Sequence, residues 1–252
     1  MCEAAHSALG LPLQRVSHLT SFMRILLAVL ALSSFAAFTL PATAQTRLVD
    51  DFESNADNVI PRGWHYLEGR DFVPMSEKYN GQGEWFRTKK EGGRTFLRGY
   101  TDGEAHRIVL ANDGQRLDWD LRDKSFLQWD WRAVQLPAGA NEKNSDKNDT
   151  GAAVYVTFDN DWLGRPRSIK YTYSPTLPVG TTESFGNLKV VVVASALDGI
   201  NRWSTVTRDV KADYRGLFGK NAPDRPTAIT FWNDSDNTKT VAISDFDNLR
   251  LR

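Results

Sequence analysis

The chain contains a single cysteine, Cys2, so no disulfide can form within it. It has no excess of charge of either sign, because 31 Lys and Arg residues balance 31 Asp and Glu residues. Nucleic-acid-binding proteins generally carry a basic excess, so the balance argues against a nucleic-acid partner. The sequence also lacks a Gly-x-Ser-x-Gly elbow and a phosphate-binding loop. After residue 44 its only histidines are His65 and His106, too few for a His-rich metal site.

The longest apolar stretch is too short for a membrane span. It covers residues 25–40 and is interrupted by three polar residues, whereas a spanning helix needs about 20 apolar residues. A single basic residue precedes it, and Ala42-x-Ala44 follows with the small side chains of a signal-peptide cleavage site. We therefore predict that 1–44 comprises an N-terminal extension and a signal peptide, cleaved after Ala44. Residues 45–252 are then a single exported domain, periplasmic or secreted, without a membrane span.

Two details of this N-terminal region stay open. Met23 lies where a signal peptide normally begins, so translation starts at either Met1 or Met23. An N-terminal membrane anchor is the alternative to cleavage.

Residues 45–252 show a strand-like pattern throughout. Alternating or β-branched runs are separated by turn residues such as Asn112-Asp113-Gly114. The strands are expected at 47–53, 95–100, 106–111, 125–134, 151–159, 167–174, 187–195, 203–210, 227–233 and 240–251. This pattern predicts an all-β protein, a single β-sandwich or jelly roll.

Other segments depart from the strand pattern. One short helix is expected at about 211–218, with Asp209 near its start and Gly219 near its end. The polar stretch 141–150 is expected to be a long loop. Residues 54–94 are less regular, and we predict loops that cap one end of the sandwich.

Both ends of the domain resemble carbohydrate-binding jelly-roll modules of the galactose-binding type. Residues 48–53 form a short acidic and aromatic segment, Gly63-Trp64 follows it, and 243–251 contains an Asp-Asn-hydrophobic-x-hydrophobic strand. The resemblance implies a glycan ligand and no organic cofactor.

The same resemblance implies a structural Ca²⁺ that joins the first and last strands. Its candidate ligands are Asp51, Glu53 and Asp247. Because Ca²⁺ takes 6–8 oxygen ligands, backbone carbonyls would have to supply several of them. Solvated acidic strand ends are the alternative.

A second resemblance covers roughly residues 120–252. The segments that carry it are 127–132, 152–158, 208–210 and 233–238. This series resembles a family of exported bacterial proteins known only as a domain of unknown function. The family implies a β-sandwich and export, without an established reaction.

Alternation divides the side chains of each strand between two faces. In 125–134 it places Trp129 and Trp131 in the core. We expect the opposite faces of four strands to form one polar surface with an aromatic platform. Its members are Gln128, Asp130, Arg132, Tyr155, Lys170, Trp232 and Asp234. Planar polar groups and an indole suit a sugar, whereas a solvated face with ion pairs is the alternative.

Three functions are compatible with this pattern. The first is an exported, non-catalytic β-sandwich that binds a glycan or polyol at the cell envelope. The second is a glycan-acting hydrolase or lyase that uses Asp130 and Asp234, which requires their strands to be neighbours, because glycosidase carboxylates lie about 5–9.5 Å apart. The third is a periplasmic scaffold protein without a small ligand. We expect His106 to be a surface or structural residue and not a base.

Overall fold

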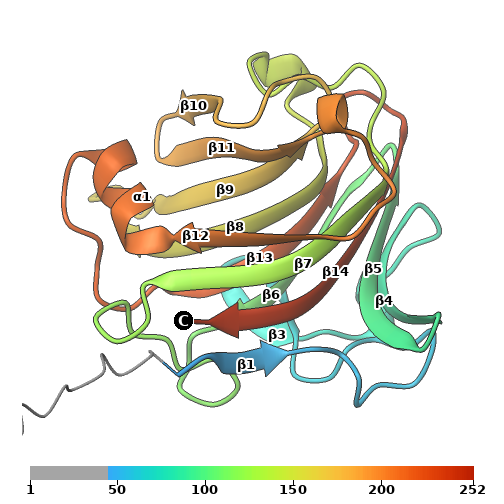
Figure 1. Ribbon diagram of the computed structural model, residues 1–252, viewed down its shortest axis with the longest axis horizontal. Coiled ribbons are helices and arrows are strands. Elements are labelled where there is room, and N and C mark those ends of the chain that lie inside the picture. The colour runs from blue at the N-terminus through green and yellow to red at the C-terminus, as the bar shows by residue number, and fades with distance from the viewer. Residues whose placement is uncertain (1–44) are drawn as a thin grey trace, which may run out of the picture. The chain divides into compact units, whose positions relative to one another are not determined.

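The computed structural model describes residues 45–252 (Figure 1). The predicted signal peptide and its cleavage after Ala44 lie outside the described residues. No helix within 45–252 is long and apolar enough to cross a membrane.

Two β-sheets form the domain, as the all-β prediction requires. The six-stranded sheet has the order β12 (Ser204–Asp209), β7 (Phe126–Gln135), β14 (Val241–Leu251), β5 (Arg94–Asp102) and β4 (Glu84–Glu91), and β1 (Arg47–Asp50) also pairs with β14.

The eight-stranded sheet has the order β10 (Thr182–Phe185), β11 (Leu188–Ser195), β9 (Pro166–Ser174), β8 (Thr150–Asn160), β13 (Ala228–Asp234), β6 (Ala105–Ala111), β2 (His65–Glu68) and β3 (Asp71–Pro74). Only β9 and β11 run parallel among the described strand pairs. The two sheets pack as a β-sandwich, which confirms the predicted fold class.

Aromatic side chains from the two inner faces form the core. Trp129 and Trp131 on β7 are fully buried. Their ring centroids lie 5.6 Å from Tyr171 and 5.4 Å from Tyr173 on β9 of the other sheet. Residues at i and i+2 point to the same face of a strand, so each strand that buries these rings presents its intervening residues outward. The predicted core role of both tryptophans is confirmed.

The single α-helix of the described residues, α1 (Val210–Phe218), closes one edge of the sandwich. It begins after Asp209, whose carboxylate accepts a hydrogen bond from the Ala212 N–H at 3.0 Å. It ends at Gly219, which adopts the left-handed conformation with φ 67°. Buried Tyr214 packs on Phe158 of β8, with ring centroids 4.5 Å apart. The expected helix at 211–218 is thus confirmed to within one residue.

The prediction of loops for 54–94 is incomplete, because short strands lie between the loops. This region contains β2, β3, the 3₁₀ turn η1 (Glu77–Tyr79) and β4. Four-residue strands such as β2 and β3 are too short to show alternation, and β10 was missed for the same reason. Two further 3₁₀ turns, η2 (Ser145–Lys147) and η3 (Ala196–Asp198), lie in connections.

The first and last strands are neighbours. β1 and β14 pair antiparallel, with Arg47 opposite Leu251. Buried Asp50 at the end of β1 accepts a hydrogen bond from the indole N–H of Trp64 at 2.7 Å and pairs with Arg116 at 2.5 Å. The Gly-Trp motif is therefore anchored to the start of the domain through this carboxylate.

Candidate functional site

The expected polar surface is divided between the two sheets. β7 belongs to the six-stranded sheet, whereas β8, β9 and β13 belong to the eight-stranded sheet. Gln128, Asp130 and Arg132 therefore lie on one outer face of the sandwich. The other outer face carries Tyr155, Lys170, Trp232 and Asp234. The single-face prediction is wrong because alternation decides which way a side chain points and not which sheet its strand joins.

The predicted catalytic pair does not form. β7 borders β12 and β14, whereas β13 borders β6 and β8. Asp130 and Asp234 are consequently on strands of different sheets. The hydrolase hypothesis required β7 and β13 to be adjacent strands, and they are not.

On the six-stranded sheet, ion pairs across strands occupy the predicted polar residues. Arg94 pairs with Asp130 at 2.7 Å and also with Asp247. The Arg132 Nε donates to Asp245 at 2.8 Å, and Asp245 is fully buried. These charges already have partners, so this face acts as a structural network.

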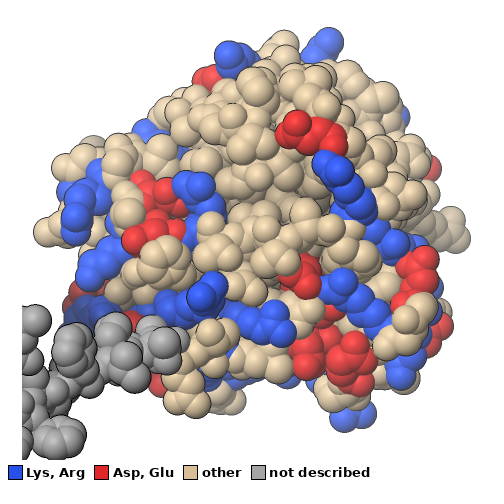
Figure 2. Space-filling model, viewed as in Figure 1, with Lys and Arg blue, Asp and Glu red and all other residues tan. Residues whose placement is uncertain are grey.

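Gln128 and the charged side chains of the face seen in Figure 2 also have polar or oppositely charged neighbours. Gln128 accepts a hydrogen bond from Arg252 at 3.1 Å. Figure 2 shows acidic and basic side chains next to one another on the face turned to the viewer, and neither sign forms a separate field.

The predicted calcium ligands are engaged by protein donors. Glu53 accepts a hydrogen bond from the Thr95 N–H at 2.9 Å, and Asp51 accepts one from the Glu53 N–H at 3.2 Å. Asp247 is ion-paired with Arg94, although burial raises the pKa of its carboxyl to about 6. In this structure the carboxylates of Asp51, Glu53 and Asp247 do not meet as one ligand group.

Another acidic group lies at the end of β13. Among residues 45–252, only Asp149, Asp234 and Asp236 place carboxylate oxygens within 4.8 Å of one another. Lys170, 1% exposed, lies on the same face, and its Nζ donates to the Asn148 backbone oxygen at 3.2 Å. Burial raises the pKa of Asp234 to about 7, against the opposing effect of the Lys170 charge. Lys170 is therefore a buried counter-charge to this acidic group.

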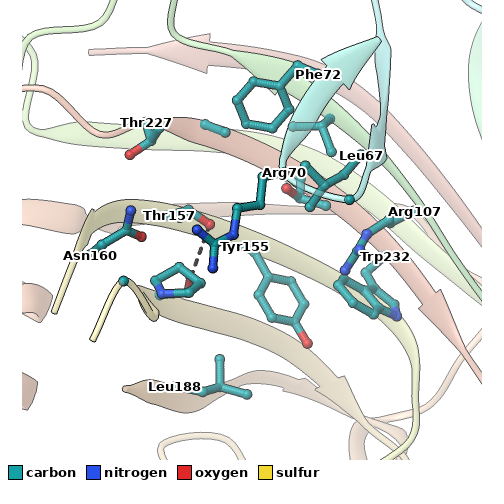
Figure 3. Close-up of a pocket in the computed structure, with 17 residues that line it drawn as sticks. Leu67, Arg70, Phe72, Arg107, Tyr155, Thr157, Asn160, Leu188, Thr227 and Trp232 are labelled. Atoms are coloured by element: carbon teal, nitrogen blue, oxygen red, sulfur yellow. Dashed lines mark hydrogen bonds between the residues drawn. The ribbon is translucent and has the colours of Figure 1, made fainter. Parts of the chain in front are cut away.

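A pocket of about 530 Å³ opens on the outer face of the eight-stranded sheet (Figure 3). Strands β6, β8, β9 and β13 form its floor, and the β2–β3 hairpin and the β8–β9 turn form its walls. It contains two of the predicted site residues, Tyr155 and Trp232. Their rings are 5.1 Å apart at an interplanar angle of 31°.

Strand register explains why these side chains meet. Trp232 lies opposite Arg107 of β6, and Tyr155 lies opposite Thr230 of β13. The Arg107 guanidinium carbon lies 4.5 Å from the Trp232 ring centroid. Burial and the charge of Asp234 raise the pKa of Tyr155 above its usual range, so the phenol keeps its proton and can donate a hydrogen bond.

Hydroxyl and amide groups border the aromatic pair. Thr157 and Ser168 share a hydrogen bond of 3.0 Å between their hydroxyls. Asn160 and Thr230 also line the pocket. These groups both donate and accept hydrogen bonds, the combination that recognises a polyol.

An exposed tryptophan stands next to this pocket. Trp162 is 88% exposed and lies in the β8–β9 turn, between the lining residues Asn160 and Gly164. Asp161 accepts hydrogen bonds from the Leu163 N–H at 2.9 Å and from the Arg165 Nε at 2.7 Å, which hold the turn in shape. Trp side chains are highly buried on average, so this ring is available to a ligand in a way that the core tryptophans are not.

Sequence reasoning missed Trp162 and two arginines that line the pocket, Arg70 and Arg107. The signal for Trp162 was its place directly after the Asn160-Asp161 turn, where strand alternation ends. No sequence signal indicated the two arginines, because their position depends on which strands pair.

A comparison with known protein families finds one match. Residues 73–250 match the model of a family described as "Protein of unknown function (DUF3047)", which begins earlier than the resemblance seen from residue 120. The comparison with curated proteins finds no match.

Several solved structures have a similar fold. The family 11 carbohydrate-binding module of a cellulosomal cellulase of Clostridium thermocellum is 14% identical, with a TM-score of 0.41, over 82% of this chain and 94% of that one. The family 30 module of another Clostridium thermocellum cellulase is 11% identical, with a TM-score of 0.38, over 69% and 88%. The xyloglucanase domain of NopAA from Sinorhizobium fredii is 10% identical, with a TM-score of 0.35, over 69% and 95%. We base no functional argument on similarities this distant.

Proposed function

Because this chain belongs to the DUF3047 family of proteins of unknown function, its role has to be inferred from its own residues, and we propose that it is an exported, non-catalytic β-sandwich protein that binds a glycan or polyol at the cell envelope. One observation carries the proposal: the pocket on the eight-stranded sheet combines an aromatic pair with hydroxyl and amide groups.

The chemistry of the pocket matches that of a sugar. A pyranose ring presents C–H groups that pack on an aromatic face, and its hydroxyls need partners that donate and accept. Tyr155 and Trp232 supply the aromatic surface, and Thr157, Ser168 and Asn160 supply the polar partners. A volume of about 530 Å³ lies within the range of pockets that hold small ligands.

Two sequence features support export. The signal peptide predicted for 1–44 would direct the chain across a membrane. Residues 45–252 contain no cysteine, so the domain needs no oxidative folding in that compartment.

Binding is favoured over hydrolysis by the placement of the carboxylates. The predicted pair, Asp130 and Asp234, is separated between two sheets. The aromatic pocket is lined by no Asp or Glu among the described residues.

Calorimetric titration of a panel of oligosaccharides tests the proposal. We expect Trp232→Ala and Trp162→Ala each to weaken binding by about tenfold, because each removes a ring on which a sugar can pack. Trp85→Ala is the matched control, since Trp85 stacks on Tyr100 at 5.3 Å on the six-stranded sheet. Circular dichroism verifies that each variant is folded.

Two results would contradict the proposal. If the intact protein binds no saccharide, the function is wrong. If it binds one with the same affinity in all three variants, the ligand site lies elsewhere.

A further inference from the structure

The pocket carries positive charge without any compensating acid. Its lining includes two charged residues, Arg70 and Arg107, and no Asp or Glu. Arg107 extends from β6 on the pocket floor, and Arg70 occupies the two-residue turn between β2 and β3 at the edge. In Figure 3 the Arg70 side chain reaches from this turn toward Tyr155, and Arg107 lies beside Trp232.

Both arginines differ from those that form ion pairs across the sandwich. Arg98, Arg132 and Arg208 each contact a carboxylate at 2.6 to 2.7 Å. The ion pairs and side-chain hydrogen bonds formed within residues 45–252 include neither Arg70 nor Arg107.

Arg107 is the more confined of the two. Its side chain is partly buried against the Trp232 ring, and burial lowers its pKa. No carboxylate of the described residues is among the groups that influence its pKa, which besides burial are the phenols of Tyr66 and Tyr155. Asp234 lies two residues after Trp232 on β13, but its carboxylate interacts with the Lys170 charge. A partly buried guanidinium without a carboxylate partner keeps its N–H groups available to an acceptor on a ligand.

An oxyanion is the ligand group that such a site recognises. A guanidinium stacked on an aromatic ring keeps its N–H edge free, and that planar fork matches the two oxygens of a carboxylate or sulfate. The rest of the lining is aromatic and hydroxyl-bearing, which suits the ring and hydroxyls of a sugar.

We propose that this pocket binds an acidic saccharide, with Arg107 on the floor and Arg70 at the edge receiving the oxyanion of a uronate carboxylate or a sulfate ester. The inference rests on the proposed saccharide-binding function and names its ligand class. Neutral glycans lack the group that pairs with the two guanidinium groups, so they bind more weakly.

Calorimetric titration of the intact protein with matched ligands tests the charge. The probes are an oligogalacturonate, its neutral methyl ester, a sulfated oligosaccharide, a cello-oligosaccharide, and inorganic phosphate and sulfate. We expect the methyl ester to bind at least about tenfold more weakly than the free acid, because it lacks one charged hydrogen-bonding group. Tighter binding of either the uronate or the sulfated ligand identifies the source of the oxyanion.

Variants test the residues. Arg107→Gln should weaken binding of the acidic ligand by at least about tenfold and reduce its preference over the neutral one, whereas Arg107→Lys keeps the charge and should lose less. Arg215→Gln, an exposed position on α1, is the control for the change in net charge. The comparison of free acid and methyl ester on the unaltered protein needs no variant, so it remains decisive if Arg107→Gln does not fold.

Each contrary result has a separate meaning. Equal affinity for acid and ester, with no effect of Arg107→Gln, overturns this inference and leaves the saccharide-binding function in place. Phosphate or sulfate that binds as tightly as the acidic saccharide also overturns it, because the pocket is then a site for small anions. A folded protein that binds none of the saccharides overturns the proposed function itself.

Discussion

At the scale of single residues, the role of a charged side chain in this protein is decided by whether it has a partner. Arg94 joins Asp130 and Asp247 across three strands of the six-stranded sheet, and its donors are engaged there. Arg107 on the other sheet also lies over an indole ring, as Arg94 does over Trp203, but it has no carboxylate partner within residues 45–252. The first stabilises the fold, whereas the second keeps its hydrogen-bonding capacity for a ligand.

Burial of a neutral histidine predicts a pH dependence of stability. His106 is 3% exposed, and burial together with the neighbouring Arg107 charge lowers its pKa from 6.5 to about 4. Glu84 lies 3.6 Å from its Nδ1 and would favour the charged form, but burial has the larger effect. His106 is therefore a structural residue, one of the two roles that the sequence predicted.

The direction follows from which state binds the proton. Below pH 6.5 the unfolded chain protonates His106, whereas the folded protein does not until about pH 4. As the pH is lowered from 6.5 to 4, we expect protonation of His106 in the unfolded chain to reduce the free energy of unfolding by about 3 kcal/mol. This figure is the pKa difference converted at 1.36 kcal/mol per pKa unit. Urea denaturation from pH 4 to 7 measures it, with His106→Gln as the comparison. Equal slopes in the two proteins would show that His106 does not contribute.

At the scale of elements, short strands and tight turns position the site. The β2–β3 hairpin uses only Gly69 and Arg70 to turn, with Gly69 at φ 65°, and so presents Arg70 at the pocket edge. The braced turn after β8 presents Trp162 in the same way. Turns and very short strands have no alternating sequence pattern, so the sequence does not predict where these two side chains lie.

Close contact between strands predicts opposite effects for two glycines. A Cβ at Gly99 of β5 would lie 2.6 Å from Cε1 of Phe86, a fully buried ring. We expect Gly99→Ala to reduce the free energy of unfolding by about 1–3 kcal/mol through overpacking. Gly216 in α1 has no heavy atom within 4 Å of such a Cβ, so Gly216→Ala should raise it by up to about 1 kcal/mol. Chemical denaturation measures both, and an unaffected Gly99→Ala would show that Phe86 has room to move.

At the scale of the whole molecule, the pairing of β1 with β14 joins the two ends of the domain. The resemblance to jelly-roll modules led to the prediction of calcium at this junction, and the ion itself stays a prediction. Its proposed ligands are held by other protein groups, whereas Asp149, Asp234 and Asp236 gather at the end of β13.

Thermal unfolding with EDTA and then with added Ca²⁺ tests this prediction. A ligand that binds only the folded state raises the midpoint. Asp247 is ion-paired with Arg94, so the acidic group at the end of β13 is the better candidate for an ion. If EDTA lowers the unfolding midpoint and Ca²⁺ restores it, we expect Asp236→Asn to abolish this effect and Asp51→Asn to retain it. The reverse pattern would place the ion at the chain ends after all, and no fall with EDTA would remove the calcium prediction.

The predictions from sequence differ in quality for a physical reason. The direction of a side chain along one strand and the caps of one helix depend on neighbours within a few residues, as for Trp129 and Asp209. The predicted site mixed residues whose strands never meet, such as Asp130 and Asp234. Tyr155 and Trp232 were placed together correctly because β8 and β13 do pair.

The sequence alone therefore determined the all-β class, the inward and outward faces of the long strands and the limits of α1, because local geometry sets each of them. Only the tertiary structure decided which strands share a sheet. The pairing of strands places Asp130 and Asp234 on different sheets, brings Asp247 into an ion pair with Arg94, and places the Arg107 guanidinium over the Trp232 ring. Hydrogen bonding between strands joins segments far apart in the chain, and no local pattern encodes which partner each strand will take.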